Sequence, residues 1–104
     1  MNTEISVIRN EIADLSVAKL DLGFLEALAN NALYCLNKHQ TATVTPLPRT
    51  QKRLVDDVMT DLLQILHKEV VWAKEELEQE HHAAALDYYQ KAKSQIVASL
   101  DLLL

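Results

Sequence analysis

The chain has 104 residues, of which 49% are hydrophobic and 24% are charged, and its formal net charge is −5 with histidine neutral. This length suits a single domain, and the balance of apolar and charged residues argues against general disorder. One glycine and two prolines are too few for the tight turns of a sheet protein, and the negative charge argues against binding to nucleic acid or an anionic membrane. We therefore predict an all-α fold.

The N-terminal residues include early acidic side chains and lack the basic region and apolar run of a signal peptide. No stretch of the sequence approaches the ~20 apolar residues that a membrane-spanning helix needs. We therefore expect a cytoplasmic protein that does not interact with a membrane.

The first predicted helix covers residues 3–38, where apolar side chains recur at steps of three and four residues and form one face of a helix. These positions are Ile5, Ile8, Ile12, Leu15, Ala18, Leu22, Leu25, Ala29, Ala32 and Leu36. Gly23 lies inside the pattern, but one interior glycine costs only about 1 kcal/mol relative to alanine. We predict a helix that is continuous, or kinked at residues 21–23, with the single cysteine, Cys35, as a small buried apolar residue.

Residues 39–49, with the sequence HQTATVTPLPR, interrupt this pattern with threonines and two prolines. Proline cannot continue a helix, and it pushes the preceding residue toward extended geometry. We therefore predict a Pro-containing loop, followed by a second helix from about residue 50.

The second half of the chain is helical by pattern, but its length requires a choice. Residues 62–86 contain none of the residues that usually cap or break a helix, so a single helix over 50–104 is allowed locally. Such a helix would be ~80 Å long, which is rare in a globular domain. We predict a break near residues 79–82 that leaves helices at about 50–80 and 82–104.

The resulting prediction is a single helical domain over residues 1–104, a bundle of three long helices. The alternative is a long antiparallel helical hairpin that dimerises, because the first helix would cover only part of an unbroken second helix. The apolar C-terminal segment should pack on the bundle or on a partner in either case.

The acidic and histidine-rich block at residues 75–82 is a candidate metal site. Glu78 and His81 have the Glu-x-x-His spacing of di-iron helical bundles, which need two such motifs and two further glutamates. Only one copy is present, and His81 and His82 point about 100° apart on a helix. We therefore predict no metal, no cofactor and no catalytic residues, and we retain a metal-dependent helical enzyme that uses this block as the alternative function.

A small basic cluster, formed by Arg49, Lys52 and Arg53, lies at the start of the second predicted helix. It could contact phosphate or an acidic partner. Lys52 and Arg53 each precede an aspartate by four residues, which is typical of ion pairs on a helix surface. Three charges are a weak footprint for nucleic acid, so we consider nucleic-acid binding unlikely.

Residues 85–92 resemble the second helix of a tetratricopeptide repeat, with small residues at Ala85 and Ala92 and an aromatic residue at Tyr89. The resemblance covers one repeat of about thirty residues, and Glu80 occupies the position of the glycine found in that family. A single repeat cannot bury its own faces. We therefore interpret the similarity as a property of closely packed helices and assign no family.

The remaining function class is a non-enzymatic protein-protein interaction module, such as a small adaptor, inhibitor or chaperone-like subunit. It would bind a protein partner, or a second copy in a homo-oligomer, by placing an apolar helix face against a partner helix or groove. The interface candidates are the amphipathic aromatic residues and the C-terminal apolar residues. They are Trp72, Tyr88, Tyr89, Ile96, Leu100, Leu103 and Leu104.

Overall fold

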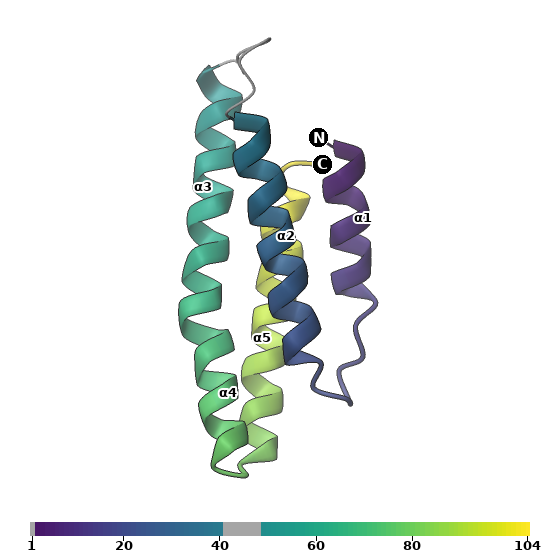
Figure 1. Ribbon diagram of the computed structural model, residues 1–104, viewed down its shortest axis with the longest axis vertical. Coiled ribbons are helices and arrows are strands. Elements are labelled where there is room, and N and C mark those ends of the chain that lie inside the picture. Colours follow the sequence, from purple (N-terminus) through teal and green to yellow (C-terminus); the bar gives the residue numbers. More distant parts are fainter. Residues whose placement is uncertain (1, 41–48) are drawn as a thin grey trace.

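The computed structural model describes residues 2–40 and 49–104, and every regular element in these ranges is helical (Figure 1). The elements in chain order are α1 (Asn2–Ala13), α2 (Leu22–Gln40), α3 (Arg49–Ile65), the π-helix η1 (Leu66–Val70), α4 (Val71–Glu78) and α5 (His82–Asp101). The predicted all-α class is confirmed. The predicted Pro-containing loop falls almost wholly on residues 41–48, which lie outside the described residues.

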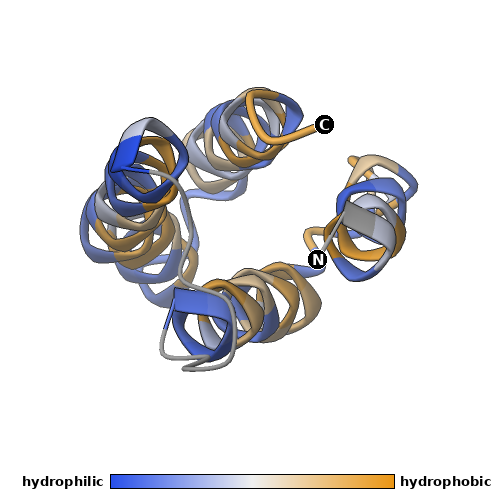
Figure 2. Cartoon of the chain, turned by 90° about the horizontal axis from the view of Figure 1, so that it is seen from above, coloured by the Kyte–Doolittle hydropathy of each residue, from blue (hydrophilic) through white to orange (hydrophobic). Residues whose placement is uncertain are grey.

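Within the described ranges the helices form a bundle of four rods, because α3, η1 and α4 follow one another as one long rod. Successive rods run in opposite directions, and Figure 2 shows them arranged around a common axis with their apolar sides facing inward. The bundle measures 49 × 22 × 17 Å along its principal axes. Its lower end in Figure 1 is formed by α4 and the start of α5, and α1 covers only the upper half.

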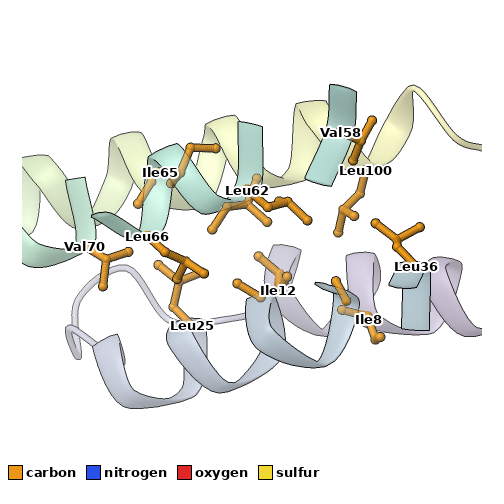
Figure 3. Close-up of a cluster of buried hydrophobic side chains, with 14 of the residues drawn as sticks. Ile8, Ile12, Leu25, Leu36, Val58, Leu62, Ile65, Leu66, Val70 and Leu100 are labelled. Atoms are coloured by element: carbon orange, nitrogen blue, oxygen red, sulfur yellow. The ribbon is translucent and has the colours of Figure 1, made fainter. Parts of the chain in front are cut away.

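The core takes a stripe of apolar side chains from each rod, and Figure 3 shows part of it. The largest fully buried side chains are Tyr89, Ile5, Ile12, Leu25, Leu36, Leu62, Ile96, Leu100, Val55, Val58 and Val70. Buried alanines at positions 29, 32, 73 and 92 let the helices approach closely. Because burial of apolar surface is the main favourable term in folding, this stripe holds the rods together.

The π-helix keeps the long rod in register with the core. Leu62, Leu66 and Val70 are all buried, at steps of four residues. A regular α-helix has 3.6 residues per turn, so two such steps rotate a side chain about 80° away from its starting direction. A π-helix has more residues per turn than an α-helix, so the η1 segment offsets this rotation and keeps the three side chains on the core side. The rod therefore continues past residue 70 without losing its contact with α5.

The prediction of one helix over residues 3–38 is wrong. α1 ends at Ala13, residues 14–21 form an irregular connection, and α2 begins at Leu22, so the bundle has four rods instead of three. The reversal places α1 beside α5, where Ile5 and Ile12 become fully buried. A continuous helix would have carried these two side chains beyond the rods that now cover them. Gly23 lies in the first turn of α2 and does not have a positive φ.

The break expected near residues 79–82 lies at residues 79–81, between α4 and α5. The N–H of His81 donates to the Glu76 carbonyl at 2.8 Å, and the N–H of Glu80 donates to the Leu77 carbonyl at 3.0 Å. Glu80 has a φ of 62°, so this is a Schellman motif with a left-handed residue after the helix end. The motif reverses the chain within three residues and lets α5 pack along α4.

Candidate protein-interaction surfaces

Three of the predicted interface residues lie in the core. Tyr89, Ile96 and Leu100 are 0% exposed on the inner face of α5. They cannot contact a partner unless the bundle opens, so they are not surface residues in this fold. Leu103 is partly buried and packs against the same core. The C-terminal apolar segment thus docks on the bundle through most of its large side chains.

Trp72 and Tyr88 form a partly exposed aromatic pair on the hairpin of α4 and α5. Their ring centroids are 5.6 Å apart with an interplanar angle of 60°, an edge-to-face arrangement. The ammonium group of Lys91 lies 5.8 Å from the centre of the Tyr88 ring, and it also contacts the Asp87 carboxylate at 3.7 Å. Such aromatic pairs contribute about 0.5–1.5 kcal/mol beyond the area they bury. Trp72 is 44% exposed, so this pair also presents apolar surface to solvent.

A second apolar surface, which the sequence did not predict, lies at the opposite end of the bundle. We define the terminal patch as Val7 on α1, Tyr34 on α2 and Leu104 at the end of the described chain. All three side chains are more than half exposed, and Tyr34 reaches 69%. Val7 and Thr3 line two adjoining grooves, one shared with Tyr34 and the other with Leu104. The patch is therefore a continuous surface built from three separate segments.

Cys35 lies in the groove between α1 and α2, beside Tyr34. Burial raises the pKa of the Cys35 thiol above its ordinary value, and the hydrogen-bonded carboxylate of Glu4 raises it further. The thiol is therefore protonated at neutral pH, and a protonated thiol is a poor nucleophile. Cys35 is only partly buried in this groove, so the prediction of a buried apolar cysteine is met in part.

The acidic and histidine-rich block occupies the end of α4 and the turn that follows. The Nδ1 atom of His81 lies 2.7 Å from Oε2 of Glu76, and the imidazole hydrogen-bonds to this carboxylate. Across residues 2–40 and 49–104, no three histidine, cysteine, aspartate or glutamate side chains gather closely enough to hold a metal ion. Glu78 lies at the end of α4 and His81 in the turn that follows it.

The basic cluster Arg49, Lys52 and Arg53 lies exposed at the start of α3. Asp56, the predicted partner of Lys52, accepts a hydrogen bond from the side-chain amide of Gln40 on α2. This contact joins the end of α2 to the start of α3 across the connecting segment. The basic side chains are thus left pointing to solvent at one end of the long rod.

Comparison of the chain with models of known protein families, with curated proteins and with solved structures gives no match. Within the described ranges, none of the helices combines the length and the apolar composition that a membrane-spanning segment needs. The two apolar surfaces are therefore the candidate sites for binding a partner.

Proposed function

We propose that this chain is a non-enzymatic protein-protein interaction module that binds a partner protein through the terminal patch. The observation that carries the proposal is that Val7, Tyr34 and Leu104 come from three segments and form one exposed apolar surface. Monomeric soluble proteins rarely expose large contiguous apolar patches unless the patch serves an interaction.

The composition of the terminal patch fits a docking site for a partner helix or extended segment. Tyrosine is enriched among residues that dominate binding energy, because it offers a large apolar ring and a polar tip. Glu4 and Asn31 line the groove beside Tyr34 and supply a polar rim. An apolar centre with a polar rim is the usual anatomy of a protein interface.

Phe24 provides a matched control for an experiment on Tyr34. Both aromatic side chains lie on α2, and they are 67% and 69% exposed, respectively. Phe24 lies in the first turns of α2, at the far end of this helix from the terminal patch (Figure 1). A difference between the two positions therefore reports the location of the interface and not aromatic exposure in general.

The test is site-specific photocrosslinking in the cells that make the protein, followed by binding measurements with the recovered partner. A photoreactive residue at position 7 should yield a discrete adduct that the same residue at position 24 does not yield. By calorimetry, Tyr34→Ala should weaken binding to the purified partner at least about tenfold, whereas Phe24→Ala should not. Adducts that are the same from both positions, or binding that tolerates Tyr34→Ala, would contradict the proposal.

A further inference from the structure

We propose that a second copy of this chain docks antiparallel along the outer face of the long rod formed by α3, η1 and α4. This face is separate from the terminal patch, so the inference does not depend on the proposed function. It rests on the distribution of charge along the rod and on Leu63, an exposed apolar residue at its midpoint.

The outer face of the long rod is a line of exposed residues at steps of one, three or four positions. Every residue in this line is classed as exposed. The line comprises Arg49, Lys52, Arg53, Asp56, Thr60, Leu63, His67, Val71, Glu75 and Glu78. The rod spans residues 49–78 and is therefore ~45 Å long at the rise of an α-helix.

The two ends of the rod carry opposite charge. Residues 49–53 contain three basic side chains and no acidic one, whereas residues 71–80 contain four acidic side chains and one basic one. That basic side chain, Lys74, pairs with Glu26 on α2. Net positive charge thus lies at the start of the rod and net negative charge at its end.

In an antiparallel pair of rods, the basic start of each copy lies against the acidic end of the other copy. With the two-fold axis at the middle of the rod, residues whose numbers sum to about 127 lie opposite one another. Arg49 then faces Glu78 of the other copy, and Lys52 faces Glu75. Leu63, which is 43% exposed, lies beside its own counterpart at the axis. A parallel pair would place like charges together, so the pattern selects the antiparallel arrangement.

The same pairing places Asp56 opposite Val71 of the other copy, and this is its least favourable contact. Asp56 is already hydrogen-bonded to Gln40, so its charge is partly satisfied within its own chain. A rod ~45 Å long and about 10 Å wide offers a footprint of ~450 Å² per copy. The total of ~900 Å² lies at the low end for specific complexes, so we expect a weak dimer whose affinity falls as salt rises.

The first experiment is sedimentation velocity of the full chain over a range of concentrations at low and high salt. We expect a concentration-dependent dimer at low salt that dissociates at high salt. Two charge-reversed variants, Arg49→Glu with Lys52→Glu and Glu75→Lys with Glu78→Lys, should each dimerise at least about tenfold more weakly. An equimolar mixture of the two should form a heterodimer, because one variant then has two acidic ends and the other two basic ends.

These substitutions should leave the helix itself intact. Acidic residues are favourable at a helix start and basic residues at a helix end, so both reversals agree with the helix dipole. Circular dichroism should therefore show unchanged helix content in each variant. This measurement separates loss of the dimer from loss of the fold.

A matched pair of leucines tests the position of the axis. Leu63→Glu places two like charges at the centre of the proposed interface and should abolish dimerisation. Leu54→Glu makes the same change at a residue that is 36% exposed, nine positions away and about 180° around the helix, and should leave the dimer intact. A monomer at every concentration, or a dimer that is insensitive to salt and to Leu63→Glu, would overturn the proposal. A dimer that is lost only on Tyr34→Ala would also overturn it and would assign self-association to the terminal patch.

Discussion

The two reversals whose connecting residues lie within the described ranges are built in different ways. The turn after α4 is three residues long and is closed by backbone hydrogen bonds from residues 80 and 81 to the preceding helix turn. The connection after α1 spans residues 14–21 and is held by side chains of α5. Each contains one non-glycine residue with positive φ, Glu80 at 62° and Leu20 at 51°.

Two side chains of α5 hold the longer connection at several points. The hydroxyl of Tyr89 donates to the Ser16 carbonyl at 3.0 Å, and the ammonium group of Lys93 donates to the Leu15 carbonyl at 2.8 Å. The backbone N–H of Asp21 lies near the phenol oxygen of Tyr89, where it acts to lower the pKa of this group. The tight turn depends on its own backbone, whereas the connection after α1 depends on residues about seventy positions away. Substitutions of Tyr89 or Lys93 in α5 should therefore affect the connection after α1 far more than the turn after α4.

The largest expected effect is that of Tyr89→Ala. The side chain is fully buried, and its removal leaves a cavity and an unpaired Ser16 carbonyl in the connection. Truncation of a buried aromatic residue costs about 3–5 kcal/mol of unfolding free energy. Urea denaturation followed by circular dichroism gives this value directly.

The neighbouring Tyr88→Ala substitution is the control for that measurement. Tyr88 is only partly buried and contacts Trp72 and Lys91 on the hairpin. Its loss should cost about 1 kcal/mol, the order of an aromatic pair contact. Equal losses at the two positions would show that the connection after α1 does not rely on Tyr89.

A smaller effect is expected from Lys93→Ala, with Lys91→Ala as its pair. Lys93 is partly buried and donates a charge-assisted hydrogen bond to the connection, so its loss should cost about 1–2 kcal/mol. Lys91 is exposed and pairs with Asp87 four residues earlier, which contributes only about 0.3–0.5 kcal/mol. Urea denaturation of the two variants measures how much the hydrogen bond from Lys93 to the connection after α1 contributes to stability. A Lys93→Ala variant as stable as Lys91→Ala would show that this hydrogen bond contributes little.

The same contrast explains which parts of the fold were predictable. The rods after residue 49 follow from their apolar periodicity, and the break between them follows from the unusual length that one helix over residues 50–104 would have. The break at residues 14–21 does not disturb this periodicity, because Leu15, Ala18 and Leu22 continue the spacing of α1. Its cause is the packing of α1 on α5 and the hydrogen bonds from Tyr89 and Lys93, and these are long-range contacts. A pattern along one helix cannot report them.

The candidate surfaces show the same limit. Two apolar stripes fit the last helix, one through Ala84 and Tyr88 and the other through Ala85 and Tyr89, and the structure buries the second. Both phases fit steps of three and four residues, so the sequence alone could not separate a core tyrosine from a surface one. Val7 and Tyr34 are large apolar residues that lie off the predicted stripe, and this position in the pattern indicates exposed apolar side chains. Their place in one patch depends on the reversal after α1.

Glycine substitutions at the two positive-φ residues should affect the turn after α4 and the connection after α1 differently. A non-glycine residue in the left-handed region costs roughly 1–2 kcal/mol, and glycine avoids this cost. Glu80 is exposed, so Glu80→Gly should stabilise the protein by about 1 kcal/mol. Leu20 packs against the core, so Leu20→Gly loses apolar contact and should give no net gain. Thermal unfolding of the two variants measures this difference, and stabilisation by both would show that Leu20 contributes little packing.

The titration of Tyr89 contributes nothing at neutral pH and emerges only in alkaline solution. Burial raises the pKa of the Tyr89 phenol, the charge of Asp21 raises it further, and the N–H of Asp21 acts in the opposite direction. A raised pKa means that the folded protein holds this proton more tightly than the unfolded chain. The stabilisation is therefore complete below the unfolded pKa of about 10 and is lost as the pH rises through the folded pKa.

Tyr89→Phe tests this assignment, because it keeps the ring and removes the titrating group. The free energy of unfolding of the unsubstituted protein should fall more steeply above about pH 10 than that of the variant. At neutral pH the variant should be less stable by about 1–2 kcal/mol, because the Ser16 carbonyl loses its partner. Parallel alkaline slopes would mean that the phenol reaches solvent in the folded state. The connection after α1 would then be held by Lys93 and by apolar packing alone.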